Sequence, residues 1–93
     1  MRVVIEPNPD AAARFAARCV AEWVTRKPEC VLALAAGATM VPVYREVVAL
    51  HRRERVSFAR ARAFDLDEYA GLAGDDPRSF VRFVREHVVE QVD

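Results

Sequence analysis

The sequence has 93 residues, enough for one small domain and no more. Hydrophobic residues make up 53% of it, a share that favours a packed globule over a disordered segment. Its 14 basic and 14 acidic residues cancel, and no apolar run approaches the roughly 20 residues of a membrane span, so neither nucleic acid nor a membrane is indicated as a partner.

The first third of the chain predicts a strand followed by a helix. Three successive apolar residues predict a short buried strand at residues 2–6. Asn8 is a suitable helix cap and Pro9 suits the first helical position, so we expect a helix over about 10–26, ended by Pro28. Its apolar stripe, at a spacing of three to four residues, consists of Ala12, Phe15, Cys19 and Trp23.

The middle of the chain predicts two further strands with a helix between them. Residues 30–35 form a continuous apolar run, typical of a parallel strand buried on both faces. Small residues at 36–39 break the run, and a helix follows over about 41–53. A third strand is expected at about 62–66. The inner stripe of the helix consists of Tyr44, Val47, Val48 and His51.

The last third predicts a polar loop over 67–76 and a final helix that runs to about residue 92. Asp76 and Pro77 repeat the pattern of a cap followed by proline. The inner stripe of this helix consists of Phe80, Val84, His87 and Val88.

The alternation of strands and helices predicts an α/β fold in the order βαβαβα. We expect an open, parallel, three-stranded sheet with flanking helices, joined by right-handed crossovers. Such a unit is part of a doubly wound, Rossmann-like domain, and its sheet has exposed edges. With no repeats or linkers in the sequence, residues 1–93 are expected to form a single, truncated domain.

Two loops follow the carboxyl ends of predicted strands, where open parallel sheets bind ligands. The first contains Gly37, Ala38 and Thr39, whose small side chains let backbone N–H groups approach an anion at a helix N-terminus. A single glycine in such a turn is more often only a tight connection. Both interpretations remain open on this loop alone.

The second loop places three acidic residues within four positions of a strand end, namely Asp65, Asp67 and Glu68. A carboxylate there can remove a proton from a carbon next to a carbonyl, which is the task of a general base in sugar isomerisation. Acidic clusters in loops are more often simply solvated, or they cap the next helix.

Four segments of the chain, residues 34–39, 56–58, 64–72 and 76–80, resemble glucosamine-6-phosphate deaminases in order and spacing. The Asp-Glu-Tyr-x-Gly-Leu segment is the most specific of them. The sister family, the 6-phosphogluconolactonases, usually has Asp-Glu-Arg at that place and an Asn after the later Ser. Tyr69 and Phe80 therefore favour the deaminases.

The resemblance implies the conversion of glucosamine 6-phosphate and water to fructose 6-phosphate and ammonia, without an organic cofactor. Asp67 matches the aspartate that carries a proton between C2 and C1 of the opened sugar. Gly37, Ala38, Thr39 and Glu68 match the residues that bind the substrate and its phosphate. No metal site is expected, and a cytoplasmic enzyme of amino-sugar metabolism is implied.

The chain also departs from the family that it resembles. The family's phosphate loop carries hydroxyl groups where this sequence has Ala36 and Ala38. The Asp-Gly-His segment that opens the sugar ring is missing, and His51 and His87 lie on predicted helix faces. We therefore expect an inactive half-site, completed by a homo-oligomer or by a missing C-terminal half. A lactonase-like fragment and a non-catalytic module that binds sugar phosphates are the alternatives.

Overall fold

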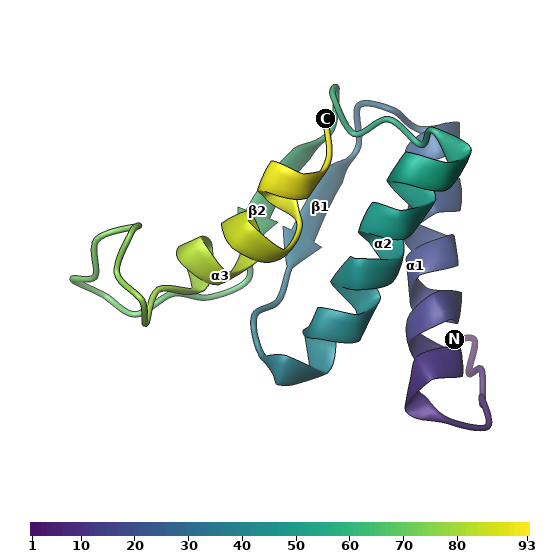
Figure 1. Ribbon diagram of the computed structural model, residues 1–93, viewed down its shortest axis with the longest axis horizontal. Coiled ribbons are helices and arrows are strands. Elements are labelled where there is room, and N and C mark those ends of the chain that lie inside the picture. The colour runs from purple at the N-terminus through teal and green to yellow at the C-terminus, as the bar shows by residue number, and fades with distance from the viewer.

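The computed structural model describes all residues from 1 to 93, and helices alternate with strands along the chain (Figure 1). The helices are α1 (Pro9–Arg26), α2 (Val41–Glu54) and α3 (Phe80–His87), and the strands are β1 (Val31–Leu34) and β2 (Arg62–Asp65). Two short 3₁₀ helices, η1 (Ala38–Met40) and η2 (Val89–Gln91), precede α2 and follow α3. The predicted α/β class is confirmed.

The two strands pair in parallel, as the sequence predicts. Val31 lies opposite Arg62 and Leu34 lies opposite Asp65, so β1 and β2 begin and end together. A hydrogen bond from the Leu66 amide to the Leu34 carbonyl, 2.9 Å long, extends the pairing one residue past the strands. The connection from β1 to β2 runs through α2, as a parallel crossover requires.

The predicted strand over residues 2–6 is not formed, and the sheet has two strands where the sequence predicts three. Val3 and Ile5 are 72% and 91% exposed, so the apolar run is not buried either. The physical reason is that a strand needs the backbone of a neighbouring strand for its hydrogen bonds. Within these 93 residues no third strand pairs with this segment.

All three helices contribute to one core on the same face of the sheet. Seven buried side chains form it, with Leu34 packed against them: Ala17, Ala21, Tyr44, Val47, Leu50, Val84 and Val88. Because side chains alternate along a strand, the opposite face carries Val31 and Phe64, which are 51% and 60% exposed. Only 12 of the 93 residues are buried, so the fold depends on few contacts.

The buried face of α1 differs from the predicted stripe. The residues that face α2 are Ala13, Ala17, Ala21 and Val24. Trp23, which the predicted stripe places inside, is 50% exposed. The Lys27 ammonium nitrogen lies 5.9 Å from the centroid of the Trp23 ring. Alanines at a spacing of four residues let two helices approach closely, and the bulky Trp23 lies outside this contact.

The predicted faces of α2 and α3 are confirmed in their central residues. Tyr44, Val47 and Val48 are buried on α2, and Val84 is buried on α3. The start of α3 is later than predicted, because Ser79 caps the helix instead of Asp76. No helix of the structure has the length and apolar character needed to cross a membrane.

Replacing Ala17 by Leu tests the close packing of α1 on α2. Ala17 is fully buried, so three added carbon atoms would force the helices apart and lower the free energy of unfolding by about 1–3 kcal/mol. Ala12→Leu on the exposed side of α1 is the control, with an expected change within about 0.5 kcal/mol. Urea unfolding measures both variants, and equal midpoints would contradict this packing.

Candidate functional site

The two loops that the sequence singles out begin at the same edge of the sheet. Leu34 and Asp65 are partners in the parallel register, so the segments that follow β1 and β2 leave the sheet side by side. The first segment turns directly into η1 and α2, whereas residues 66–79 extend outward before they return as α3 (Figure 1). The predicted common edge for the two loops is confirmed.

The first loop depends on a glycine. Gly37 has φ +120° and ψ 156°, a conformation that side chains disfavour, and it is followed by the single turn of η1. Ala38 and Thr39 are exposed, and no side chain caps the start of α2. The Met40 and Val41 amides donate to the carbonyls of Gly37 and Ala38, and Pro42 has no N–H, so the start of α2 itself offers no free donor there. The exposed backbone of residues 37–39 and the Thr39 hydroxyl are the groups that an anion could reach, near the positive end of the helix dipole.

Tyr44 anchors the transition from β1 into this loop, a role that sequence reasoning did not assign to it. Its ring is 3% exposed, and its hydroxyl donates a hydrogen bond to the Ala35 carbonyl. Burial raises the pKa of Tyr44, and the charge of Asp65 acts in the same direction. Only the position of Tyr44 on the inner stripe could have indicated this contact.

Asp65 ends β2 on the inner face of the sheet. Its Oδ1 atom is buried and has no hydrogen-bond partner in the chain. Burial raises the pKa of Asp65, and the charges of Glu68 and Asp67 raise it further. The three acids of the loop therefore have different surroundings, although the sequence presents them as one cluster.

Asp67 lies one residue past the strand-end hydrogen bond, and it is exposed. Its carboxylate forms no hydrogen bond or ion pair within the chain. An exposed carboxylate at the edge of the sheet is free to meet a bound molecule and to exchange a proton with it.

Glu68 uses both of its carboxylate oxygens within the chain. Oε2 accepts from the Ser79 hydroxyl at 2.6 Å and from the Val81 amide at 3.0 Å. Oε1 accepts from the amides of Tyr69 at 2.9 Å and Phe80 at 3.1 Å. These bonds, that of Ser79 first, lower the pKa of Glu68 to about 2.

Ser79 is the buried polar residue that sequence reasoning missed. It is 2% exposed, and its hydroxyl oxygen also accepts from the Arg82 amide at 3.3 Å. The hydroxyl thus caps α3 and at the same time donates to Glu68. The available signal was a serine directly before the amphipathic run that begins at Phe80.

Neither histidine lies at the strand ends. The Nδ1 atom of His51 donates to the Val56 carbonyl at 2.6 Å, and the His87 ring packs 4.3 Å from that of Phe83. Both contacts are made from helices, as the sequence predicts. No three His, Cys, Asp or Glu side chains gather as metal ligands would.

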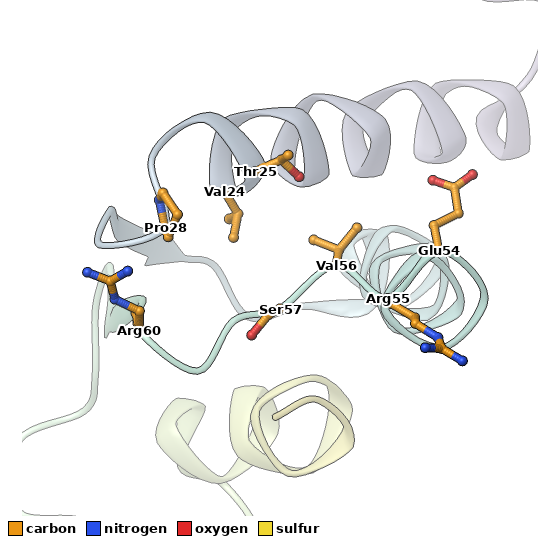
Figure 2. Close-up of a pocket in the computed structure, with 8 residues that line it drawn as sticks. All are labelled: Val24, Thr25, Pro28, Glu54, Arg55, Val56, Ser57 and Arg60. Atoms are coloured by element: carbon orange, nitrogen blue, oxygen red, sulfur yellow. The ribbon is translucent and has the colours of Figure 1, made fainter.

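The pocket drawn in Figure 2 lies beyond the amino ends of the strands, at the opposite edge of the sheet. It has a volume of about 290 Å³, with α1 on one side and residues 54–60 on the other. Arg60 at its rim pairs with Glu29, and Glu54 pairs with Arg18. Its charged groups are thus largely neutralised, and the pocket is separate from the two loops.

Comparison of the chain with known proteins points to the same family as the sequence resemblance. The chain matches no family model. It is 44% identical to glucosamine-6-phosphate deaminase 2 of Giardia intestinalis over 92 residues, which are 99% of this chain and 35% of that protein. It is 38% identical to the glucosamine-6-phosphate deaminase of Mycolicibacterium smegmatis over 93 residues, all of this chain and 36% of the relative.

The fold agrees with the sequence comparison. A solved monomeric glucosamine-6-phosphate deaminase of the NagB superfamily superimposes with a TM-score of 0.95 and 35% identity, over 100% of this chain and 39% of that protein. The chain therefore spans little more than a third of the length of the relatives that it matches. By sequence and by fold, this chain is the counterpart of the N-terminal part of the glucosamine-6-phosphate deaminases.

Proposed function

We propose that this chain supplies the proton-transferring carboxylate and the phosphate loop of a glucosamine-6-phosphate deaminase. The observation that carries the proposal is the register of the sheet, which starts the segments of Gly37 and Asp67 at one edge. The similarity to named deaminases extends over the whole of these 93 residues, so it includes both loops.

Asp67 is the proposed base. In an opened 2-amino sugar, the hydrogen on C2 lies next to the C1 carbonyl and is acidic enough to be removed by a positioned carboxylate. Asp67 would take this proton and return it to C1, while a proton from the ammonium group passes to the C1 oxygen. The product is an imine at C2, which water hydrolyses to a ketone and ammonia. The exposure of Asp67 and its lack of partners within the chain agree with this role.

The phosphate would bind at Gly37, Ala38 and Thr39. Backbone N–H groups of residues 37–39 and the Thr39 hydroxyl are the donors that this loop offers, at the positive end of the α2 dipole. Ala36 and Ala38 contribute no hydroxyl, so the backbone has the larger share of the binding here. Each hydrogen bond to a charged phosphate is worth roughly 1.5–3 kcal/mol.

The ring-opening group and the basic residues that hold the phosphate would come from the remainder of a longer protein or from a partner. The uncovered sheet face with Val31 and Phe64 is the surface that such a part would cover. In the same assembly, we propose that residues 2–6 pair with a further strand and restore the Rossmann-like sheet. Because a phosphorylated sugar does not cross membranes unaided, the proposed location is the cytoplasm.

The isolated chain is expected to release no ammonia from glucosamine 6-phosphate. Most of the substrate is a closed ring, and general acid–base assistance, such as ring opening requires, is worth about 10²–10⁴-fold in rate. No histidine of this chain lies at the strand ends to provide that assistance. An ammonia-release assay compares the purified chain with its Asp67→Asn variant. Turnover that disappears in the variant would show that 93 residues suffice.

A hybrid enzyme tests the role of Asp67 directly. These 93 residues would replace the matching segment of the monomeric deaminase, whose backbone they follow closely. In an active hybrid, Asp67→Asn is expected to lower kcat by about 10²–10⁴-fold, because the proton transfer loses its base. Asp75→Asn, an exposed acid in the same loop, is the control with unchanged kcat. Full activity of the Asp67→Asn hybrid would overturn the proposal.

A further inference from the structure

The carboxylate of Glu68 joins two segments that are distant in the chain. It accepts one hydrogen bond from Tyr69 in its own loop and three from the start of α3, at Ser79, Phe80 and Val81. Four donors around one carboxylate are as many as its two oxygens ordinarily accept. The acid loop is therefore attached to α3 through a single side chain.

We propose that Glu68 is a positioning residue, whose carboxylate holds the turn at residues 67–69 against the first turn of α3 and so fixes where the Asp67 carboxylate stands. The proposal rests on the proposed role of Asp67 as the base. It replaces the substrate-binding role that the resemblance implies for Glu68, because no acceptor site of Glu68 remains free for a sugar.

The helix to which Glu68 is hydrogen-bonded, α3, is itself packed into the core of the protein. Val84 on α3 and Val88 after it are 5% and 6% exposed and belong to the buried cluster. Hydrogen bonds from the start of α3 to Glu68 therefore connect an exposed loop to packed residues. The rings of Tyr69 and Phe80, with centroids 5.0 Å apart, make a second contact between the same two segments.

The hydrogen bonds of Glu68 limit how far its exposed neighbour Asp67 can move. Residues 66–79 extend away from the sheet, and such a loop moves freely unless hydrogen bonds restrain it (Figure 1). Glu68 is the next residue after Asp67, so fixing the backbone at residue 68 limits the Asp67 side chain to its own rotamers. A base placed about 1 Å away from its target loses much of its effect.

The test is an NMR comparison of the 93-residue chain with Glu68→Gln, Glu68→Ala and Ser79→Ala. The control is Glu90→Gln, an exposed acid on η2 without a hydrogen-bond partner. Backbone order parameters at residues 67–69 are expected to fall from about 0.85 in the original chain to below about 0.6 in Glu68→Ala. Glu68→Gln keeps one carbonyl acceptor and should recover part of the order.

Hydrogen exchange gives the second readout. The Phe80 and Val81 amides should exchange about tenfold faster or more in Glu68→Ala, because they lose an acceptor that carries a full charge. Amides of α1 and α2 should exchange unchanged, which shows that the core is folded. If Glu68→Ala loosens the core as well, Ser79→Ala decides, since it removes one donor to Glu68 and the cap bond from the Arg82 amide but leaves the carboxylate and its three amide donors, and it should still mobilise residue 67.

Two results would overturn the proposal. Unchanged order at Asp67 in both the Glu68→Ala and Ser79→Ala variants, with faster exchange only in α3, would make Glu68 a helix cap alone. If the Glu90→Gln control lowered the order at residues 67–69 equally, the cause would be the change in net charge and not the loss of the hydrogen bonds to Glu68. Neither result depends on catalysis, so a failure of the deaminase role in the hybrid enzyme would be recognised separately.

Discussion

The parallel pairing of β1 with β2 is the constraint on which the rest of the structure depends. Because the strands are parallel and begin together, the segments after Leu34 and Asp65 must leave the same edge. The crossover also requires α2 to lie against the sheet, where Tyr44 reaches back to the Ala35 carbonyl. Four residues of pairing in each strand thus place the turn at Gly37 and the acidic loop beside each other.

The two loops are fixed by different means. The turn at Gly37 is short, and its shape follows from one positive φ angle and the helix that begins directly after it. The acidic loop is long and has no regular structure, so its order has to come from side chains. Glu68 and Ser79 provide it, with charge-assisted hydrogen bonds to the start of α3.

The pKa shift of Glu68 describes the same attachment in terms of pH. Its pKa falls to about 2 in the folded chain, below its ordinary value near 4.5, so the ionised form is stabilised by folding. That contribution is complete above about pH 4.5 and is lost as the pH falls towards 2. The pKa values of Asp76, which pairs with Arg78, and of Asp93, which accepts from Ser57, are lowered as well, so acid weakens several contacts at once.

The sequence predicts those parts of the fold whose signals are local. Buried apolar runs and breaks at Pro28 and Gly37 place β1, α2 and β2 to within two residues. The prediction of a strand at residues 2–6 is wrong, because strand pairing depends on a neighbouring strand that no local pattern reveals. The predicted buried face of α1 is wrong, because the small size of Ala17, and not the hydrophobicity of Trp23, decides which side of the helix meets α2.

In the candidate site, too, local signals could be predicted from the sequence and contacts between distant residues could not. The common edge for Gly37 and Asp67 follows from element order alone, and it could be predicted. The partners of Glu68 could not, since Ser79 is eleven residues away and the intervening loop has no periodicity. A cluster of acids in a sequence gives their number but not their surroundings, which here range from an exposed Asp67 to a fully hydrogen-bonded Glu68.

The most direct test of the account is to map, by NMR, where a phosphorylated amino sugar contacts this chain. Glucosamine 6-phosphate at millimolar concentration should shift the amide resonances of Gly37, Ala38 and Thr39 together with that of Asp67, because both loops meet one ligand at one edge. Inorganic phosphate should shift the first set alone. Shifts confined to residues 54–60 at the opposite edge, or none at Asp67 with the sugar, would contradict the shared site.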